Sequence, residues 1–339
     1  MIIQIKTIES KEEWSKFVDE YSPHTFLQNW EWKLSQEIMG NKTFSLGIYD
    51  DDELIGVAFV YKITARRGSF LFCPHGPLVK EEKDSAYGDF FRYIKDLANQ
   101  EKVDFIRISP LEIKTDESVK IFKDAGFKDA PLHMHPELAW ILNIEPSEEQ
   151  LLKGMKKRTR YSINKAEKDG VELISSTELK DLDAFYEVYM ETANRQEFVP
   201  FSKEYIKKEF DIFGKEGKIL IFFAKYQNEI IATAMIIYSN GSGFYHHGAS
   251  TRNHTNITAS EFLQWQAIRE AKRRGIKLYN FWGVAPESAV NHPWVGLSRF
   301  KRGFGGFEEE YVHAQDLPIT LKYWLNFAVE TIRRIKRKY

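Results

Sequence analysis

The sequence contains a single cysteine, Cys73, among its 339 residues. A lone cysteine excludes a disulfide within the chain and suits a reducing compartment. The first residues, MIIQIKTIESKEEW, lack the basic-then-apolar pattern of a secretory signal. No apolar run approaches the ~18 residues that a membrane-spanning helix needs. Together these absences predict a cytoplasmic protein.

The chain also lacks an excess of either charge. It has 48 lysines and arginines against 49 aspartates and glutamates, a formal net charge of −1. Global attraction to a polyanion is therefore excluded, and any contact with nucleic acid or a membrane has to come from a local patch. Hydrophobic residues make up 43% of the chain, which predicts a globular protein. Aromatic residues make up 14%, enough to fill a core and also to line a binding groove.

Two pairs of segments repeat at a nearly constant distance. Residues 49–63 (YDDDELIGVAFVYKI) and 226–239 (YQNEIIATAMIIYS) each have the pattern of a strand, a polar turn and a second strand, with Glu53 corresponding to Glu229, an offset of 176 residues. Residues 85–108 and 260–283 each have the pattern of an amphipathic helix, a short turn and a buried strand, with Val103 corresponding to Ile276, an offset of 173 residues. The two similar distances indicate an internal duplication.

Each half therefore has the order helix, helix, hairpin, further strand, helix, strand. This order resembles the acyl-CoA N-acyltransferase fold of the Gcn5-related (GNAT) enzymes. We expect an α/β protein of two tandem GNAT-like domains, each with a mixed sheet and flanking helices, at residues 1–145 and 146–315. Pro146 and the acidic residues after it suit a domain join and a helix start.

Glycine is scarce where that fold usually needs it. GNAT enzymes generally hold the pyrophosphate of coenzyme A in a glycine-rich loop at a helix N-terminus. Residues 250–265 (STRNHTNITASEFLQW) contain no glycine, and in the first half acidic residues within 81–84 precede the helix. The fold thus indicates acyl transfer, while these loops argue against coenzyme A as the acyl donor.

Four stretches, in this order along the chain, resemble the FemABX family: FLQNWEW (26–32), KKRTRYSINKAEKDGVEL (156–173), LYNFWGV (278–284) and FKRGFGGFEEEYV (300–312). Members of this family are aminoacyl-tRNA-dependent enzymes that build the interpeptide bridges of peptidoglycan. They have two acyltransferase-like domains. The present chain shows no sustained heptad run and so resembles the short form without a coiled-coil insertion.

The resemblance implies transfer of an amino acid from aminoacyl-tRNA to an amine of a lipid-linked or UDP-linked muropeptide precursor. It implies no cofactor, because aminoacyl-tRNA is a co-substrate. It also implies that a C-terminal helix in residues 316–339 packs back on the first domain. Two alternatives stay open: a coenzyme A-dependent N-acyltransferase, and a non-catalytic module that binds RNA or muropeptide.

Phe300 and Lys301 match the Phe-Lys pair at the transfer site of the family, which implies that they are catalytic. Amine attack on an ester carbonyl builds negative charge on oxygen, and a fixed ammonium stabilises that charge where water is excluded. Phe300 would supply the apolar wall. Gly303, Gly305 and Gly306 permit close backbone approach and positive φ. The alternative is a surface cation beside a turn.

The resemblance also implies contacts to the precursor. Tyr205 and Tyr245 match tyrosines that contact the muropeptide in the family. Arg195 ends a predicted helix and is placed to pair with a phosphate or a carboxylate. Lys33 lies one helical turn from Gln36, where the first-domain lysine of the family falls. The alternatives are core packing for the tyrosines and compensation of a helix dipole for Arg195.

A basic stretch, residues 153–168, holds seven lysines or arginines and one glutamate. On a helix these residues form a positive face suited to tRNA phosphates or anionic lipid, and we expect exposed side chains at Lys156, Lys157, Arg158 and Arg160. A solvated helix without a partner is the alternative.

The last nine residues, TIRRIKRKY, hold five basic residues after an amphipathic helix. This tip would contact lipid or tRNA, or have no partner. Peripheral contact with the inner surface of the cytoplasmic membrane is therefore part of the expectation.

Two histidine pairs are weaker signals. His133 and His135 alternate as on a strand face, but no third ligand accompanies them, so no metal site is expected. His246 and His247 follow Tyr245, and one of them is a candidate proton shuttle, with core packing as the alternative.

Overall fold

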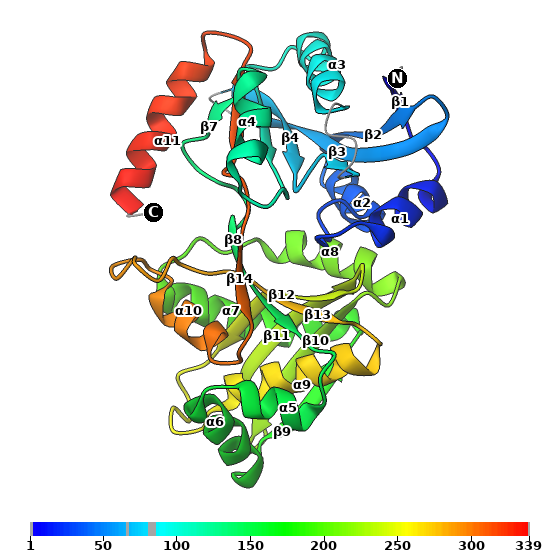
Figure 1. The fold of residues 1–339 in the computed structure, drawn as a ribbon. Coiled ribbons are helices and arrows are strands. Elements are labelled where there is room, and N and C mark those ends of the chain that lie inside the picture. The colour runs from blue at the N-terminus through cyan, green and yellow to red at the C-terminus, as the bar shows by residue number, and fades with distance from the viewer. Residues whose placement is uncertain (1–2, 66–67, 81–85, 338–339) are drawn as a thin grey trace. The chain divides into compact units, whose positions relative to one another are not determined.

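The structure, a computed structural model, describes residues 3–65, 68–80 and 86–337. The acidic residues at 81–84 and the last two residues of the basic tip lie outside this part of the chain. Compact contacts divide the chain into two units, coloured from blue to red along the sequence in Figure 1. Within the described residues, no helix is long and apolar enough to cross a bilayer.

Unit 1 comprises residues 1–138, 286–293 and 309–339. Its sheet has the strand order β1-β2-β3-β4-β6-β15-β7, with β5 paired to β3. Its strands are β1 (Ile3–Thr7), β2 (Lys42–Asp50), β3 (Glu53–Ala65), β4 (Gly68–Pro74), β5 (Leu78–Val79), β6 (Phe105–Ser109), β7 (Lys128–Asp129) and β15 (Gln315–Pro318). Its helices are α1 (Lys11–Glu20), α2 (Trp30–Ile38), α3 (Ala86–Gln100), α4 (Asp116–Asp124) and α11 (Tyr323–Arg337).

Unit 2 comprises residues 139–285 and 294–308. Its sheet has the order β14-β8-β13-β12-β11-β10-β9. The strands are β8 (Leu138–Asn143), β9 (Glu172–Ser176), β10 (Ile219–Tyr226), β11 (Glu229–Ser239), β12 (Ser242–Ser250), β13 (Leu278–Gly283) and β14 (Phe307–Glu310). The helices are α5 (Glu148–Gly154), α6 (Lys157–Lys168), α7 (Leu182–Gln196), α8 (Lys203–Lys215), α9 (Ala259–Arg273) and α10 (Val295–Arg302), with a short 3₁₀ turn, η2 (Leu179–Asp181).

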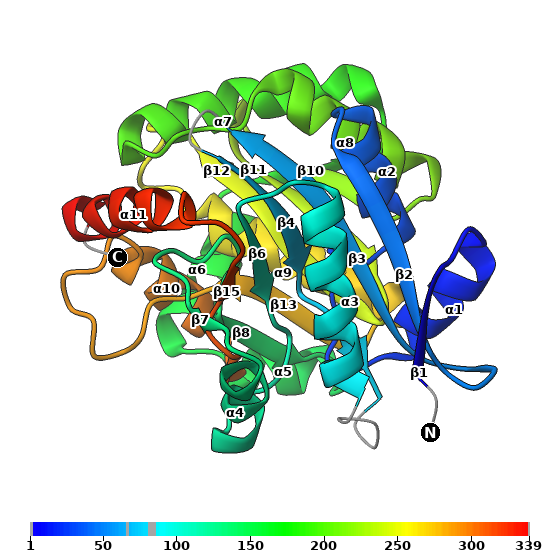
Figure 2. The same ribbon diagram turned by 90° about the horizontal axis from the view of Figure 1, so that it is seen from above.

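The predicted fold class is confirmed: each unit has a mixed sheet with flanking helices. Among the described residues, the elements from β1 to β7 and from β9 to β14 follow the same order, apart from β5, which occurs in unit 1 only, and the turn η2, which occurs in unit 2 only; unit 2 also adds β8, α5 and α6 before β9. Helix α3 in unit 1 and helix α9 in unit 2 have the same length, and both ends are displaced by 173 residues. Figure 2 shows α3 lying across the strands of the first sheet. Phe90 and Ile94 of this helix pack on Ala58 and Val60 of β3, together with the buried Cys73.

The core of unit 2 follows from strand alternation. Ala232, Ala234 and Ile236 of β11 pack with Trp265 and Ile268 of α9 in one buried cluster. Successive side chains on a strand point to opposite faces, so the intervening residues of β11 face the other side of the sheet. Helices α7 and α8 cover that side.

The contact division differs from the boundaries expected from sequence. Strand β8 precedes the expected join at 145/146, yet it pairs with β13 and so belongs to the second sheet. Strand β15 pairs with β6 on one side and β7 on the other, so the chain returns to the first sheet before α11 begins. The return is fixed by backbone hydrogen bonds, which composition does not reveal.

Candidate active site in unit 2

The pairing of strands β12 and β13 ends partway along the second sheet. They run parallel and pair only from Ser242–Leu278 to Phe244–Asn280. Beyond that point each strand is irregular: the pairing of β12 with β11 shifts after Tyr245, and that of β13 with β8 shifts after Asn280. Trp282 has a left-handed φ of 67°. Bulges of this kind bend strands apart and are common next to active sites.

Helix α10 inserts two side chains beside this opening. Ser298 and Lys301 are its buried residues and share one face at i, i+3 spacing. The Ser298 hydroxyl accepts a hydrogen bond from the backbone N–H of Ala285 at 2.7 Å. The Lys301 ammonium donates to the carbonyl oxygen of Gly283 at 2.6 Å. The helix is thereby fixed to the end of β13.

Lys301 is 4% exposed. Its Nζ lies 5.9 Å from the centre of the Tyr245 ring, so the ammonium spans from β13 to β12 where their pairing has ended. Burial lowers the pKa of Lys301 to about 7, because the ammonium loses hydration that its one carbonyl partner does not replace. A buried cation interacts strongly with a negative charge that develops nearby, because the surrounding protein screens the interaction less than water does.

The glycines after Lys301 let this segment approach β8. Gly305 and Gly306 have φ values of 85° and 99°, whereas Gly303 has an ordinary φ of −63°. A Cβ on Gly306 would lie 2.2 Å from the carbonyl oxygen of Ile141, and one on Gly303 would lie 2.4 Å from Thr159 Oγ1. Close approach is required at both positions, and positive φ only at the later glycines.

A pocket of about 170 Å³ lies beside this opening, within unit 2. Its walls come from α7, β11, β12, α9 and α10 and include Thr192, Tyr245, Ser250 and Phe300. The Tyr245 hydroxyl rests against Gly248, where a Cβ would lie 1.7 Å from the oxygen. The pocket is smaller than the ~300–1,000 Å³ typical of drug-sized or cofactor sites, so it suits a small acyl group.

Arg195 lies at the edge of this pocket. Its guanidinium donates to the Ser250 hydroxyl at 3.1 Å and lies 3.9 Å from the carboxylate of Glu191. Tyr205 is not among the pocket-lining residues in the described part of the chain; its ring stacks on Phe201 at 4.7 Å. Of the predicted site residues, Phe300 and Tyr245 line the pocket. Lys301 and Arg195 lie behind its walls, Lys301 against the Tyr245 ring and Arg195 against Ser250, whereas Tyr205 packs on Phe201.

Lys33 belongs to unit 1. Its ammonium lies 3.7 Å from the centre of the Trp30 ring and 3.6 Å from the carboxylate of Glu37, one turn further along α2. Gln36, by contrast, is buried and accepts a hydrogen bond from the Asn41 amide. Of the two positions, only the half-buried Lys33 therefore offers a positive charge that solvent or a ligand can reach.

The basic stretch forms α6 and its N-terminus. Lys156, Lys157 and Arg158 are exposed, as expected. The expectation is wrong for Arg160: its guanidinium donates to the carbonyl oxygens of Leu152 at 3.2 Å and Lys153 at 3.0 Å. Both carbonyls lie in the last turn of α5, and that of Leu152 also accepts from the backbone N–H of Met155 at 3.2 Å, so Arg160 serves as a helix cap beside the backbone cap.

The two histidine pairs singled out in the sequence lie in different surroundings. His133 and His135 lie in an irregular segment after β7, not on a strand, and His135 stacks on Phe72. His246 and His247 both face Glu209 of α8. Burial lowers the pKa of His247 to about 4, which is too low for a proton shuttle near neutral pH.

Sequence reasoning missed Glu209, although α8 carries the signal. The helix buries Ile206, Phe210 and Phe213, and Glu209 is a carboxylate in the same i, i+3, i+4, i+7 stripe. Acidic side chains are almost never fully buried unless they have partners, so its position in the stripe marks a partnered carboxylate.

Comparison with known proteins agrees with this geometry. Residues 9–230 and 221–331 match the FemAB family. The lipid II:glycine glycyltransferase of Staphylococcus haemolyticus is 18% identical over 379 residues, covering 89% of this chain and 90% of the relative. The protein of the same name from Staphylococcus saprophyticus is 19% identical over 369 residues, covering 87% and 88%.

Solved structures show the same fold. A crystal structure of FemX has a TM-score of 0.85 at 18% identity, covering 96% of this chain and all of that one (100%). A tandem GNAT protein from the clavulanic acid biosynthesis pathway has a TM-score of 0.58 at 10% identity, covering 94% and 98%. These likenesses confirm the tandem GNAT-like architecture. The match to the family model extends over most of the sequence and establishes that the chain belongs to the FemAB family.

Proposed function

We propose that this protein transfers an amino acid from aminoacyl-tRNA to an amine of a peptidoglycan precursor. The observation that carries the proposal is the buried Lys301 ammonium at the opening between β12 and β13, against the ring of Tyr245, which lines an acyl-sized pocket together with Phe300. The attacking amine nitrogen bonds to the ester carbonyl carbon, and the bond from that carbon to the ribose oxygen of tRNA breaks. The amine proton leaves with the ribose oxygen.

In this reaction Lys301 stabilises the negative charge on the carbonyl oxygen. Such charge appears mainly in the transition state, so the ammonium accelerates the reaction without strengthening substrate binding equally. Phe300 and Tyr245 exclude water from the pocket, and Arg195 pairs with an anionic group of the precursor at its rim. Tyr205 and Lys33 are proposed as further precursor contacts away from this pocket.

The direct test incubates the purified protein with a mixture of charged tRNAs and a muropeptide, then measures the mass of the muropeptide. A gain equal to one or more amino-acid residues, dependent on charged tRNA, is the expected result. An unchanged mass with every charged tRNA and with both lipid-linked and UDP-linked precursors would overturn the proposal.

Contact with a lipid surface accompanies the proposal, since the staphylococcal relatives are named for a lipid-linked substrate. Helix α11 binds unit 1 through the buried Tyr323 and through Glu330. Its other side exposes an apolar face with basic residues on one flank. The apolar members are Trp324, Leu325, Ile332 and Ile335, and the basic members are Arg333 and Lys336.

We expect the protein to float with vesicles of phosphatidylcholine and phosphatidylglycerol, because this face joins apolar area to positive charge. Leu325→Ser with Ile332→Ser should lower binding by about tenfold or more, the loss expected for two apolar side chains. Arg333→Gln with Lys336→Gln should lower binding only when phosphatidylglycerol is present. Absence of flotation by the unaltered protein would contradict the lipid contact.

The exposed cations at the start of α6 are proposed to bind tRNA. Lys156→Glu, Lys157→Glu and Arg158→Gln together should lower tRNA affinity by about tenfold or more and flatten its salt dependence, since fewer counterions are released. Arg158 becomes glutamine because it lies near Glu261, which a new carboxylate would repel. Arg160 is left intact as a cap. Filter binding at several salt concentrations makes the measurement.

A matched variant tests whether location matters. Lys180→Glu with Lys277→Glu removes two exposed cations from the same unit at other positions. It should leave tRNA affinity within about twofold of the unaltered protein. Equal losses in both variants would mean that tRNA responds only to net charge, and the α6 face would have no special role.

Coenzyme A-dependent acyl transfer is the second candidate, favoured by the tandem GNAT likeness. The start of α9 argues against it: Thr258 donates its hydroxyl to the carbonyl of Ser162, and the Glu261 carboxyl lines the adjoining pocket. A carboxylate at a helix N-terminus competes with a phosphate for the same positive field. We therefore expect calorimetry to find no micromolar binding of acetyl-CoA, and tight binding would favour this second candidate.

A further inference from the structure

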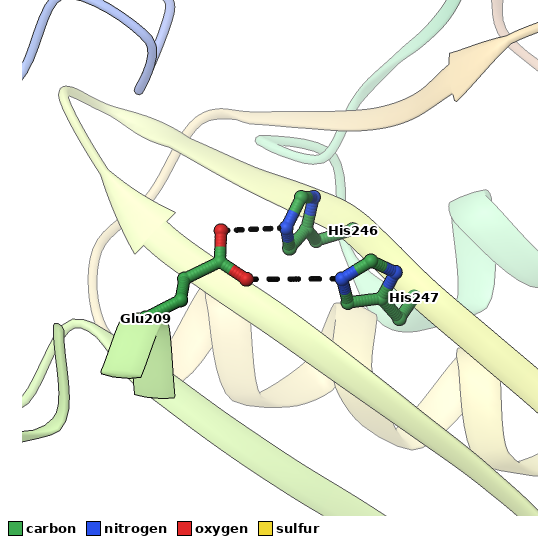
Figure 3. Close-up of side chains that lie close together, drawn as sticks. All are labelled: Glu209, His246 and His247. Atoms are coloured by element: carbon green, nitrogen blue, oxygen red, sulfur yellow. Dashed lines mark hydrogen bonds and ion pairs between the residues drawn. The ribbon is translucent and has the colours of Figure 1, made fainter. Parts of the chain in front are cut away.

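A carboxylate and two imidazoles meet on the side of the second sheet covered by α7 and α8. Glu209 comes from α8, and His246 and His247 are consecutive in β12 (Figure 3). His246 Nε2 lies 2.9 Å from Glu209 Oε1, and His247 Nε2 lies 3.7 Å from Glu209 Oε2. The Glu209 side chain is fully buried and that of His247 is 7% exposed.

Consecutive residues of a regular strand would point to opposite faces of the sheet. Here the ladder with β11 pairs Ile236 with Tyr245 and Met235 with His247, which leaves His246 as an extra residue. This β-bulge turns both imidazoles toward the same carboxylate. The bulge therefore has a consequence that a plain strand could not produce: two nitrogen donors on one side.

The cluster is not satisfied by its own hydrogen bonds. Glu209 Oε2 and His247 Nε2 are both buried, and in the described part of the chain neither has a hydrogen-bond partner. They face one another at 3.7 Å, beyond the range of a hydrogen bond. Polar atoms buried in this way are expected to have a partner, so something that bonds to both atoms at once is missing from the protein's own groups.

The spacing suits a metal ion. One oxygen or nitrogen ligand atom from each of the three side chains lies within 4.8 Å of the others. Zinc bonds to carboxylate oxygen and imidazole nitrogen are about 2.0–2.2 Å long, and tetrahedral geometry then places the donors about 3.3 Å apart. His246 and His247 approach different oxygens of the carboxylate, at 2.9 and 3.7 Å, and these distances lie on either side of that value.

We propose that Glu209, His246 and His247 form a binding site for a divalent transition-metal ion of the zinc class. Two imidazoles and one carboxylate disfavour Mg²⁺ and Ca²⁺, which prefer all-oxygen sites. Three protein ligands leave a coordination position open. The ion ties α8 to β12 one residue beyond Tyr245, whose ring lines the pocket. This inference stands independently of the proposed function.

The test uses the full chain, stripped with a chelator and dialysed free of it. Titration with Zn²⁺ should show one equivalent bound, and Co²⁺ should give the absorption bands of a low-symmetry site. Zn²⁺ should also raise the unfolding temperature, because the ion binds the folded state. Glu209→Gln keeps the side-chain shape and removes the anionic ligand, so affinity should fall by about 100-fold or more.

His254→Gln is the matched control. His254 also faces a carboxylate, Glu229 at 3.4 Å, but the pair belongs to no three-ligand group in the described residues. This variant should bind Zn²⁺ like the unaltered protein. Binding of well under one equivalent by the unaltered protein would show that the cluster is an ordinary buried ion pair, and this result requires no variant to fold. Undiminished binding in Glu209→Gln would equally overturn the site.

Discussion

Replacing Lys301 with methionine should lower the rate of the proposed aminoacyl transfer by about 10²–10³, the usual loss for one group that stabilises an oxyanion. Methionine keeps much of the stem and removes the charge. The Michaelis constant for the precursor should change little, because the charge that Lys301 meets develops mainly in the transition state. Initial rates at varied precursor concentration separate the two quantities.

The same substitution should make the folded protein more stable at pH 7. The pKa of Lys301 falls from 10.5 to about 7 on folding, so the buried ammonium costs about 1.4 kcal/mol for each unit of that shift. Loss of the hydrogen bond to Gly283 offsets about 1–3 kcal/mol of the gain. A net gain of about 2–4 kcal/mol is expected, visible as a higher unfolding temperature.

The pH dependence has a definite sign. Between pH 7 and 10.5 the unfolded chain binds a proton at this position that the folded chain has lost, so the stability of the unaltered protein should rise with pH across that window. The penalty is fully present below pH 7. The advantage of Lys301→Met should therefore shrink as the pH rises toward 10.5, as measured by thermal unfolding at several pH values.

Arg299→Met is the control for this experiment, because Arg299 is an exposed cation of the same helix. Arg302 is a poorer control: its guanidinium donates to the carbonyl of Ala285 and to the Glu308 carboxylate, both at 2.8 Å, so its loss would disturb packing. A Lys301→Met variant with an unaltered rate would remove Lys301 from the chemistry. An unaltered rate constant with weaker precursor binding would make it a substrate contact instead.

Replacing Arg107 with methionine should destabilise the protein by about 3–5 kcal/mol. Arg107 of β6 donates two hydrogen bonds of 2.7 Å to Asp316 of β15 and another of 2.7 Å to Glu330 of α11. The Asp316 side chain is fully buried, so its carboxylate would lose its main partner in a medium that penalises charge. Chemical denaturation measures the loss.

Adding Asp316→Asn to Arg107→Met should restore more than half of the lost stability, because the buried charge disappears with its partner. Hydrogen exchange should show β15 and α11 as the segments that open in the single variant. Arg92→Met removes an exposed arginine of α3 and should change stability by less than about 1 kcal/mol. Equal effects of the two arginine variants would mean that the buried network adds nothing.

Sequence patterns captured what local periodicity encodes. The repeat predicted α3 and α9 at a constant displacement, because each is a long amphipathic helix before a buried strand. The Phe-Lys pair led to the buried ammonium, since its neighbours matched a known family. These features depend on residues near one another in the chain.

Features that depend on partners distant in the sequence were not predicted. Strand β15 has four residues and ends in proline, and its partner β6 lies some two hundred residues earlier, so no local pattern marks it. Arg160 looked like its basic neighbours, and only the end of α5 shows that it is a cap. Glu209 of α8 stands out only because a bulge in β12 turns His246 and His247 toward it, and no pattern within α8 predicts that contact.

The return of β15 to the first sheet also sets the order in which a ribosome can complete the two units. All strands of unit 2 have been synthesised by residue 310, whereas β6 keeps an unpaired edge until residues 315–318 emerge. At the usual ~5–20 residues per second, that edge waits about 10–40 s. The unit begun first is thus finished last. A nascent chain interrupted before β15 exposes an unpaired edge of β6, which is prone to pair with other chains unless a chaperone covers it.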